Sequence, residues 1–382
     1  MVSEWSWSAE IGILFGVVSF GLTFFLIIAV QYRRYGRFTW LRLLGAGAVS
    51  VYLTTLVAYT LLPLPVSRGK VCAATLQLVP FHFVSDIVSD TAGDGVLGTL
   101  TNTATLQVVF NVLLFIPLGI IVRGFFSRGL RMTVLIGLAT SVLIEVTQYT
   151  GIFGLYSCPY RVADVDDVLT NTLGAVIGGL LGPVVLAWMP RERELRAARA
   201  TPRPVTVWRR WLGMAIDWAL FGALGFALVT PYSLVWIVMT GSAPDQPDAV
   251  NAALNALVPG LIVFMVPALR GTGASLGQSA VWLAPRWPVE ASLGRRSIGR
   301  RLARAVSVGG LYSVLMFITG IGTAAADWAN LVAGLLLFAD FVAVPLTREH
   351  GGLSGLITGA VMRDQRELAP EPVAPASQSS AP

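Results

Sequence analysis

A glutamate and a glutamine lie inside a stretch that is otherwise apolar enough for a lipid bilayer. The run "MTVLIGLATSVLIEVTQYTGI" (132–152) contains Glu145 and Gln148, which share a helical face with Ser141 at spacings of four and three residues. A carboxylate inside a bilayer is costly unless it faces a polar partner or a wet cavity. Glu145 therefore predicts polar partners on neighbouring helices.

Two other apolar segments supply such partners at a comparable depth. The first is "TATLQVVFNVLLFIPLGIIV" (103–122), and the second is "RVADVDDVLTNTLGAVIGG" (161–179). If the second helix begins as early as Asp164, then Asp164, Asp167 and Asn171 lie on one stripe of its surface. Arg161 is the nearby cation, and its guanidinium fork has the geometry to bridge Glu145 and an aspartate. The predicted pocket consists of Asn111, Glu145, Gln148, Arg161, Asp164, Asp166, Asp167 and Asn171.

These residues are open to more than one interpretation. They either glue helices together through interhelical hydrogen bonds, or line a polar pocket that binds a ligand or an ion. The three aspartates have the oxygen chemistry for a hard cation, but no EF-hand-like loop accompanies them. No nucleophile–base pair, metal-ligand set or cofactor motif is visible, and His82 is the only histidine on the predicted external side.

Composition identifies the class of protein. The 382 residues are 55% hydrophobic and 13% charged, with a mean hydropathy of +0.70, so we predict an all-α, polytopic integral membrane protein whose partner is the lipid bilayer. Nine apolar runs have the length of a membrane span. They cover approximately residues 9–32, 41–62, 105–122, 132–151, 167–189, 211–239, 252–269, 306–324 and 328–346.

The arginines predict the orientation. With the N-terminus outside and the C-terminus cytoplasmic, every lysine and arginine except Arg68, Lys70 and Arg161 falls on the inner side, as the positive-inside rule requires. The net charge of +6 then reflects membrane topology and contact with anionic lipid rather than nucleic-acid binding. "GAVIGGLLG" (174–182) has small residues that favour close helix contact.

The basic, proline-containing stretch "PRERELRAARATPRPVTVWRR" divides the spans into groups of five and four. We predict a membrane module at 1–189, a cytoplasmic linker at 190–210, a second module at 211–364 and a disordered tail at 365–382. The long outer loop (63–104) contains "LQLVPFHFVSDIVSD", whose apolar spacing suits a segment on the outer leaflet. Cys72 and Cys158 both fall outside, where an oxidising environment permits a disulfide between them.

The first module resembles a known family at these residues. "LQLVPF", "NVLLFIPLG", "SVLIEVTQ" and "RVADVDDVLTNTLGAVIGG" resemble, in order and spacing over about 40–188, the signature blocks of the VanZ-like family. The resemblance implies a polytopic bacterial membrane protein linked to glycopeptide (teicoplanin) resistance or to the cell envelope. The resemblance also marks a set of residues as motif positions of the family, without assigning a role to any of them. These residues are Asn111, Pro117, Gly119, Glu145, Gln148, Asp164, Asp166, Asp167, Asn171 and Gly174.

The second module carries intramembrane charges. "WRRWLGMAIDWALFGAL" has Arg210 at the predicted inner surface and Asp217 two turns deeper, and Asp340 lies in the last span. This arrangement, with the basic "SLGRRSIGRRLARAV", is similar to the RDD family, some members of which are associated with cation transport. The sequence departs from that family at its third acidic position, where "TREHGGLSGLITG" has His350 and Gly351.

Three functions remain open from the sequence. The first is a non-enzymatic plasma-membrane protein of the bacterial envelope whose outward pocket binds a cell-wall precursor or lipid ligand. The second is an ion or small-solute transporter, although neither an ATP-binding loop nor an inverted repeat is visible. The third is a membrane enzyme acting on lipid, which the missing nucleophile pair disfavours.

Overall fold

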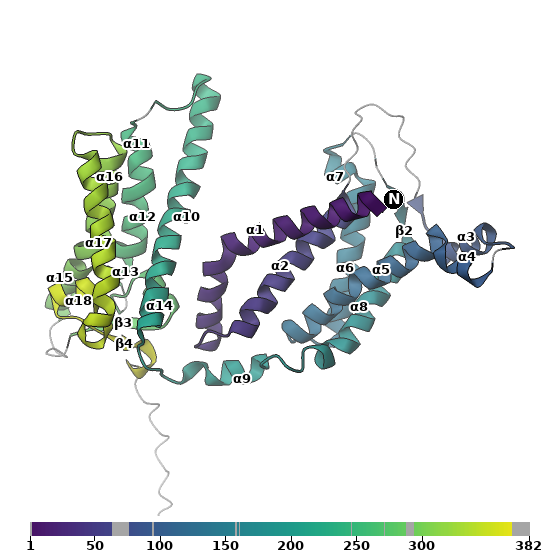
Figure 1. Ribbon diagram of the computed structural model, residues 1–382, viewed down its shortest axis with the longest axis horizontal. Coiled ribbons are helices and arrows are strands. Elements are labelled where there is room, and N and C mark those ends of the chain that lie inside the picture. The colour runs from purple at the N-terminus through teal and green to yellow at the C-terminus, as the bar shows by residue number, and fades with distance from the viewer. Residues whose placement is uncertain are drawn as a thin grey trace, which may run out of the picture. The chain divides into compact units, whose positions relative to one another are not determined.

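The computed structural model describes residues 2–62, 76–93, 95–156, 159, 161–245, 247–270, 272–287 and 294–368 (Figure 1). Within these ranges nine helices are long and apolar enough to cross a membrane, and the strands form two short pairs. The predicted all-α, polytopic class is therefore confirmed. Cys72 and Cys158, the predicted disulfide pair, lie outside the described residues.

The chain divides into two compact units that we describe separately. The first consists of residues 1–24 and 39–194, and the second of residues 25–38 and 195–382. The second unit thus includes the last turns of the first helix, which the sequence assigned entirely to the first module. The reason is a set of contacts far apart in sequence: for example, the Trp282 indole N–H donates to the Tyr32 carbonyl oxygen (2.8 Å).

The first unit is built around a group of long helices. Leu56, Phe115, Leu118, Val122 and Ala175 form its buried apolar core. Its long helices are α1 (Val2–Tyr35), which continues into the second unit, α2 (Trp40–Leu61), α5 (Thr103–Ile120) with the π-helix η1 (Ile121–Phe125), α6 (Leu130–Tyr149) and α8 (Val165–Val185).

Helices α5 and α8 run side by side at very close range (Figure 1). A Cβ atom on Gly119, Gly174 or Gly178 would collide with a backbone carbonyl oxygen of the facing helix. Because glycine has no side chain, the two backbones approach more closely than any other residue would permit. The small-residue stripe noted in the sequence has this function, and it brings the polar residues of the two helices together.

Short elements cover the end of this unit where α6 ends and α8 begins. The strands β1 (Leu76–Gln77) and β2 (Ala163–Asp164) pair in parallel, and they join the segment before α3 to the start of α8. The remaining short helices there are α3 (His82–Asp90), α4 (Val96–Thr101) and α7 (Gly151–Gly154).

The second unit contains the last four candidate spans. Aromatic side chains dominate its core, with Phe221 and Phe264 buried and Trp218 and Tyr312 packed against them. Its elements are α10 (Val207–Thr240), α11 (Ala249–Ala252), η3 (Ala253–Leu257), α12 (Val258–Gly260), η4 (Leu261–Met265), α13 (Val266–Leu269), α14 (Leu276–Ala280), β3 (Leu283–Arg286), α15 (Gly294–Ala305), η5 (Val306–Gly310), α16 (Leu311–Gly320), α17 (Ala326–Leu346), η6 (Arg348–His350), α18 (Gly352–Thr358), β4 (Val361–Asp364) and η7 (Gln365–Leu368).

Four features of the chain differ from the expected ones. Helix α10 begins at Val207, because Thr206 caps it, so Arg209 and Arg210 lie inside the helix rather than in a linker. Part of the linker is also helical, as α9 (Glu192–Ala197) and η2 (Ala198–Ala200). The basic stretch before the eighth span is the helix α15, continuous with that span. Gln365–Leu368, assigned to the disordered tail, form a 3₁₀ helix.

Candidate functional site

Helix α8 begins with three aspartates that serve different purposes. Asp164 is the N-cap, and its carboxylate accepts the Asp166 backbone N–H (2.8 Å), as the predicted early helix start requires. Asp167, one turn later, accepts hydrogen bonds from the side-chain amides of Asn111 (2.6 Å) and Gln107 (3.3 Å) on α5. The pKa of the Asp164 carboxyl is raised, chiefly because burial disfavours its charged form.

Glu145 meets this aspartate group from α6. Its side chain is 7% exposed, and its Oε2 accepts the backbone N–H of Asp164 (3.1 Å). The sequence predicted a polar partner for Glu145 on a neighbouring helix, and the structure provides one at the start of α8. Three carboxyl groups, those of Glu145, Asp164 and Asp167, lie around the first turn of that helix, whose N-terminal dipole favours negative charge.

Asp166 binds the start of α3, where Phe81 is the N-cap residue and Phe83 lies in the first turn. Its two carboxylate oxygens accept the backbone N–H groups of Phe81 (2.6 Å) and Phe83 (3.0 Å), and it is only 3% exposed. Phe81 has a φ of 64°, an unfavourable conformation for a large side chain that these bonds help to hold. Asp166 thus fixes the position of the segment "LQLVPFHFVSDIVSD" (76–90). The side chain of Phe81 in this segment is 65% exposed.

Gln148 and Asn171 hold helices together. Gln148 donates to the Thr60 carbonyl oxygen of α2 (2.7 Å), and Asn171 donates to the Ser141 hydroxyl of α6 (2.9 Å). The other amide atom of Asn171, Oδ1, is buried without a hydrogen-bond partner. Gln148 and Asn171 therefore act as interhelical glue, because each side-chain amide donates a hydrogen bond to a group on another helix.

One expectation for this cluster is wrong. The Arg161 guanidinium does not bridge Glu145 and an aspartate, because it donates to the Leu62 carbonyl oxygen instead (3.4 Å). The oxygens of the three aspartates accept hydrogen bonds from separate amide groups. The described part of the chain contains no group of three or more His, Cys, Asp and Glu side chains that could hold a metal ion.

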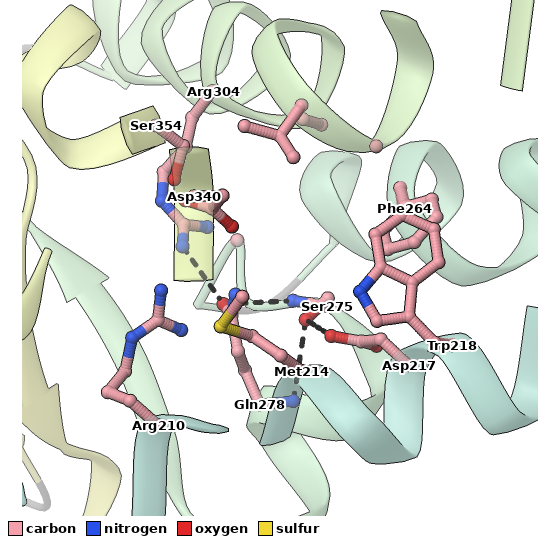
Figure 2. A pocket seen from close by; sticks show the side chains of 14 residues that line it. Arg210, Met214, Asp217, Trp218, Phe264, Ser275, Gln278, Arg304, Asp340 and Ser354 are labelled. Atoms are coloured by element: carbon pink, nitrogen blue, oxygen red, sulfur yellow. Dashed lines mark hydrogen bonds between the residues drawn. The ribbon is translucent and has the colours of Figure 1, made fainter. Parts of the chain in front are cut away.

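In the second unit, Arg210 and Asp217 line one small cavity, together with Asp340 (Figure 2). Asp217 is 3% exposed, and it accepts the Ser275 hydroxyl (2.6 Å) and the Gly277 backbone N–H (2.7 Å). Arg210 is 1% exposed and donates from Nε to the His350 carbonyl oxygen (2.9 Å). Backbone groups and a hydroxyl, rather than each other, are the direct partners of this arginine and aspartate.

Arg304 reaches the same cavity from α15. Its Nη2 donates to Gln278 Oε1 (3.2 Å), and Gln278 also completes the capping box of α14 with Ser275. Asp340 enters from α17, and its Oδ1 accepts the Leu353 backbone N–H (2.8 Å). Two arginines and two aspartates from three helices, α10, α15 and α17, therefore line one small cavity.

Sequence reasoning missed several of these residues. The sequence placed Arg304 in a basic loop whose arginines could either reach the inner mouth of the module or contact lipid phosphates. Ser275 and Gln278 carried no signal beyond the capping pattern "SLGQ". Arg209 and Asp364 form a buried ion pair (2.8 Å) that was likewise not foreseen. The regular spacing of arginines in "GRRSIGRRLARA" is the one pattern that could have indicated a helix with Arg304 at its end.

Comparison with known proteins identifies part of the chain. Residues 49–186 match the family model described as VanZ/LLP1. This range contains all the polar residues of the first-unit cluster, so the similarity to the VanZ/LLP1 family covers the part of the first unit in which they lie. No curated protein and no solved structure gave a match.

Proposed function

We propose that the chain is a non-enzymatic plasma-membrane protein of the bacterial cell envelope, whose VanZ-like domain binds an envelope ligand at the acidic cluster of the first unit. VanZ-like domains are associated with the envelope and with glycopeptide resistance. The proposed consequence of binding is reduced susceptibility to teicoplanin. The proposed orientation puts this cluster on the external side.

The single observation behind this proposal is the gathering of Glu145, Asp164 and Asp167 around the start of α8. In interhelical glue a donor on one helix meets an acceptor on another, as the Asn171 amide meets the Ser141 hydroxyl. Here three carboxyl groups lie together, and among the described residues none of them forms an ion pair. The cluster therefore has more acceptor oxygens than the protein uses.

An excess of acceptors indicates the chemistry of the ligand. Hydroxyl, amide and ammonium groups are the donors that carboxylates bind most strongly. Lipid-linked cell-wall precursors and lipid headgroups carry such groups at the outer membrane surface, and we propose one of them as the ligand. The exposed apolar side chains of Phe81 and Val88 on the neighbouring segment provide a surface for its acyl chain.

Enzymatic action on that lipid is the less favoured alternative. His82 is exposed and contacts Asp86 (3.0 Å), and His350 contacts the Val344 carbonyl oxygen (3.3 Å). Neither of the two histidines hydrogen-bonds a hydroxyl within the described ranges, so no serine or threonine there has a histidine base.

Replacement of Glu145 by glutamine tests the proposal. Glu145→Gln keeps the size of the side chain and one acceptor oxygen, so we expect normal insertion and abundance. It removes a carboxylate from the cluster, so we expect any decrease in teicoplanin susceptibility conferred by expression of the chain to be lost. The measurement is the minimal inhibitory concentration in a host without the gene, with membrane abundance measured by immunoblot.

Glu10→Gln is the matched control. Glu10 is exposed near the start of α1, and its replacement removes the same charge without altering the cluster, so susceptibility should equal that of the wild type. A Glu145→Gln chain that is present in normal amount and retains the full phenotype would contradict the proposal.

A second candidate function concerns the other unit. We propose that it is an RDD-like module, in which Arg210 and Asp217 match the family positions, and in which ion or small-solute transport is the alternative function. Four buried ionisable side chains around one cavity favour this alternative. Where the family pattern has an aspartate, Arg210 binds the carbonyl oxygens of His350 and Gly351 instead. Flux in proteoliposomes that Asp217→Asn abolishes would favour transport over envelope binding.

A further inference from the structure

The cavity of the second unit is closed to large ligands. It has a volume of about 50 Å³, whereas a water molecule needs roughly 10–15 Å³ on the same measure. Pockets for drug-sized ligands are several hundred Å³. The space therefore fits a few waters or one small ion, and it excludes a sugar, a nucleotide or a lipid headgroup.

The acceptors around this cavity are largely used by the protein itself. Both oxygens of Asp217 accept hydrogen bonds, from the Ser275 hydroxyl and the Gly277 N–H. One oxygen of Asp340 accepts the Leu353 N–H, and Gln278 Oε1 accepts from Arg304. A cation would find few free oxygens here, although divalent and alkali cations need several.

The donors, in contrast, are incompletely used. Arg210 Nη1 and Arg304 Nε are buried and have no hydrogen-bond partner. Both side chains line the cavity, and they are only 1% and 6% exposed. A buried donor without an acceptor is costly, and more so when it belongs to a charged group. In the view of Figure 2 both guanidinium groups lie to the left, with Asp340 near Arg304, and Asp217 lies to their right.

The backbone around the cavity is also unusual. Phe264 belongs to the π-helix η4, and Val308 and Gly309 belong to the π-helix η5; all three line the cavity. Single-turn π-helices are rare and occur frequently at functional sites. Two of the four π-helices in the described residues thus contribute to the lining of this one small polar cavity.

We propose that this cavity binds a small monovalent anion, of the size of chloride, nitrate or formate, between the guanidinium groups of Arg210 and Arg304. The anion supplies the acceptor that Arg210 Nη1 and Arg304 Nε lack, and it relieves the repulsion between the two arginines. The site is separate from the acidic cluster of the first unit. Binding here requires neither envelope-ligand binding nor transport.

The test is thermal stability of the full chain in lipid nanodiscs as one anion replaces another. Chloride, nitrate or formate is titrated against gluconate, which exceeds the cavity, at constant sodium concentration and ionic strength. A bound anion stabilises the folded state in proportion to site occupancy, so we expect a saturable rise in the unfolding midpoint. Broadening of the ³⁵Cl resonance, reversed by nitrate, reports binding independently of stability.

Two variants and a control assign the effect to the cavity. Arg304→Gln removes one guanidinium, and Ser354→Val narrows the cavity while keeping both arginines, so we expect either change to abolish the chloride effect. Arg348→Gln removes an exposed arginine outside the lining and should respond as the wild type does.

Several results would overturn the proposal. One is a midpoint that is the same in all four anions together with an unbroadened ³⁵Cl resonance, which would mean that the cavity holds water only. Another is a chloride response that persists in both folded cavity variants. If Arg304→Gln does not fold, Ser354→Val decides alone. Because no flux is measured, failure of the transport alternative leaves this result unchanged.

Discussion

Asp364 binds two arginines at once in the second unit. Its carboxylate accepts Arg209 Nη2 (2.8 Å) and Arg366 Nη2 (2.6 Å), and its side chain is fully buried. Burial alone would raise the pKa of this carboxyl, but the hydrogen bonds and charge of the arginines outweigh it and lower the pKa to about 2. Arg209 also binds backbone carbonyl oxygens of Val281 and Trp282, so Asp364 ties the start of α10 to β3 and β4.

Asp364→Asn is therefore expected to destabilise the protein. Removal of one partner leaves two arginines uncompensated, at a cost of about 3 kcal/mol near pH 7. The contribution of the carboxylate is present above the pKa of an unfolded aspartate, about 3.9, and is lost as the pH falls towards the folded value. The difference in unfolding midpoint between wild type and variant should hence shrink as the pH falls from about 4 to about 2.

An exposed aspartate of the same unit provides the control. Asp245→Asn alters the same type of side chain in a loop, so its midpoint should match that of the wild type throughout. A difference for Asp364→Asn that stays constant down to pH 2 would show that the carboxylate charge does not stabilise this unit.

At the scale of the elements, the contact of α5 with α8 determines whether the acidic cluster forms. Asn111 reaches Asp167 (2.6 Å) because the two backbones are close, and Gly178 lies against the Ile116 carbonyl oxygen in that contact. Side chains of ordinary size at the interface would separate the helices by more than an amide–carboxylate hydrogen bond tolerates.

Gly178→Ala tests this contact. The added methyl group has no space, so the helices must shift, with an expected loss of about 1–3 kcal/mol. The measurement is the unfolding midpoint in detergent by fluorescence-detected size-exclusion chromatography. Gly21→Ala, at a position of α1 where a Cβ atom would meet nothing within 4 Å, should leave the midpoint unchanged or slightly raised. Equal midpoints for the two variants would contradict the close-contact interpretation.

At the scale of the whole molecule, the basic segments gather within each unit. In the first unit, Arg42 donates to the carbonyl oxygens of Phe125 and Pro190, near the ends of two other spans. In the second, Arg33, Arg199 and Arg366 lie 4.3, 5.3 and 5.3 Å from the ring of Trp282. Segments far apart in sequence but predicted to be cytoplasmic are thus neighbours, as alternating spans require.

The positive-inside rule then gives a prediction for both ends of the chain. In spheroplasts, an added protease should remove a tag fused before residue 1, while a tag fused after residue 382 should be cleaved only after permeabilisation. Immunoblotting of both tags in the same sample provides the internal control. The reverse pattern would invert the topology and put the acidic cluster in the cytoplasm.

Much of this organisation follows from the sequence alone. Span number, class and the helical face of Ser141, Glu145 and Gln148 were predictable, because hydropathy and helical periodicity are local properties. The early start of α8 was also predictable, since Asp164 caps it from the adjacent position. The VanZ-like blocks located the first cluster because their residues keep a fixed order and spacing.

Only the tertiary structure decided which polar groups meet. Glu145 binds a backbone N–H rather than Arg161, Asp217 binds Ser275 and Gly277 rather than Arg210, and Arg304 turns into a cavity. Each of these pairings joins residues whose relative rotation and depth depend on how separate helices pack. Helical periodicity determines the face on which a side chain lies, but the packing of the neighbouring helices determines what lies opposite that face.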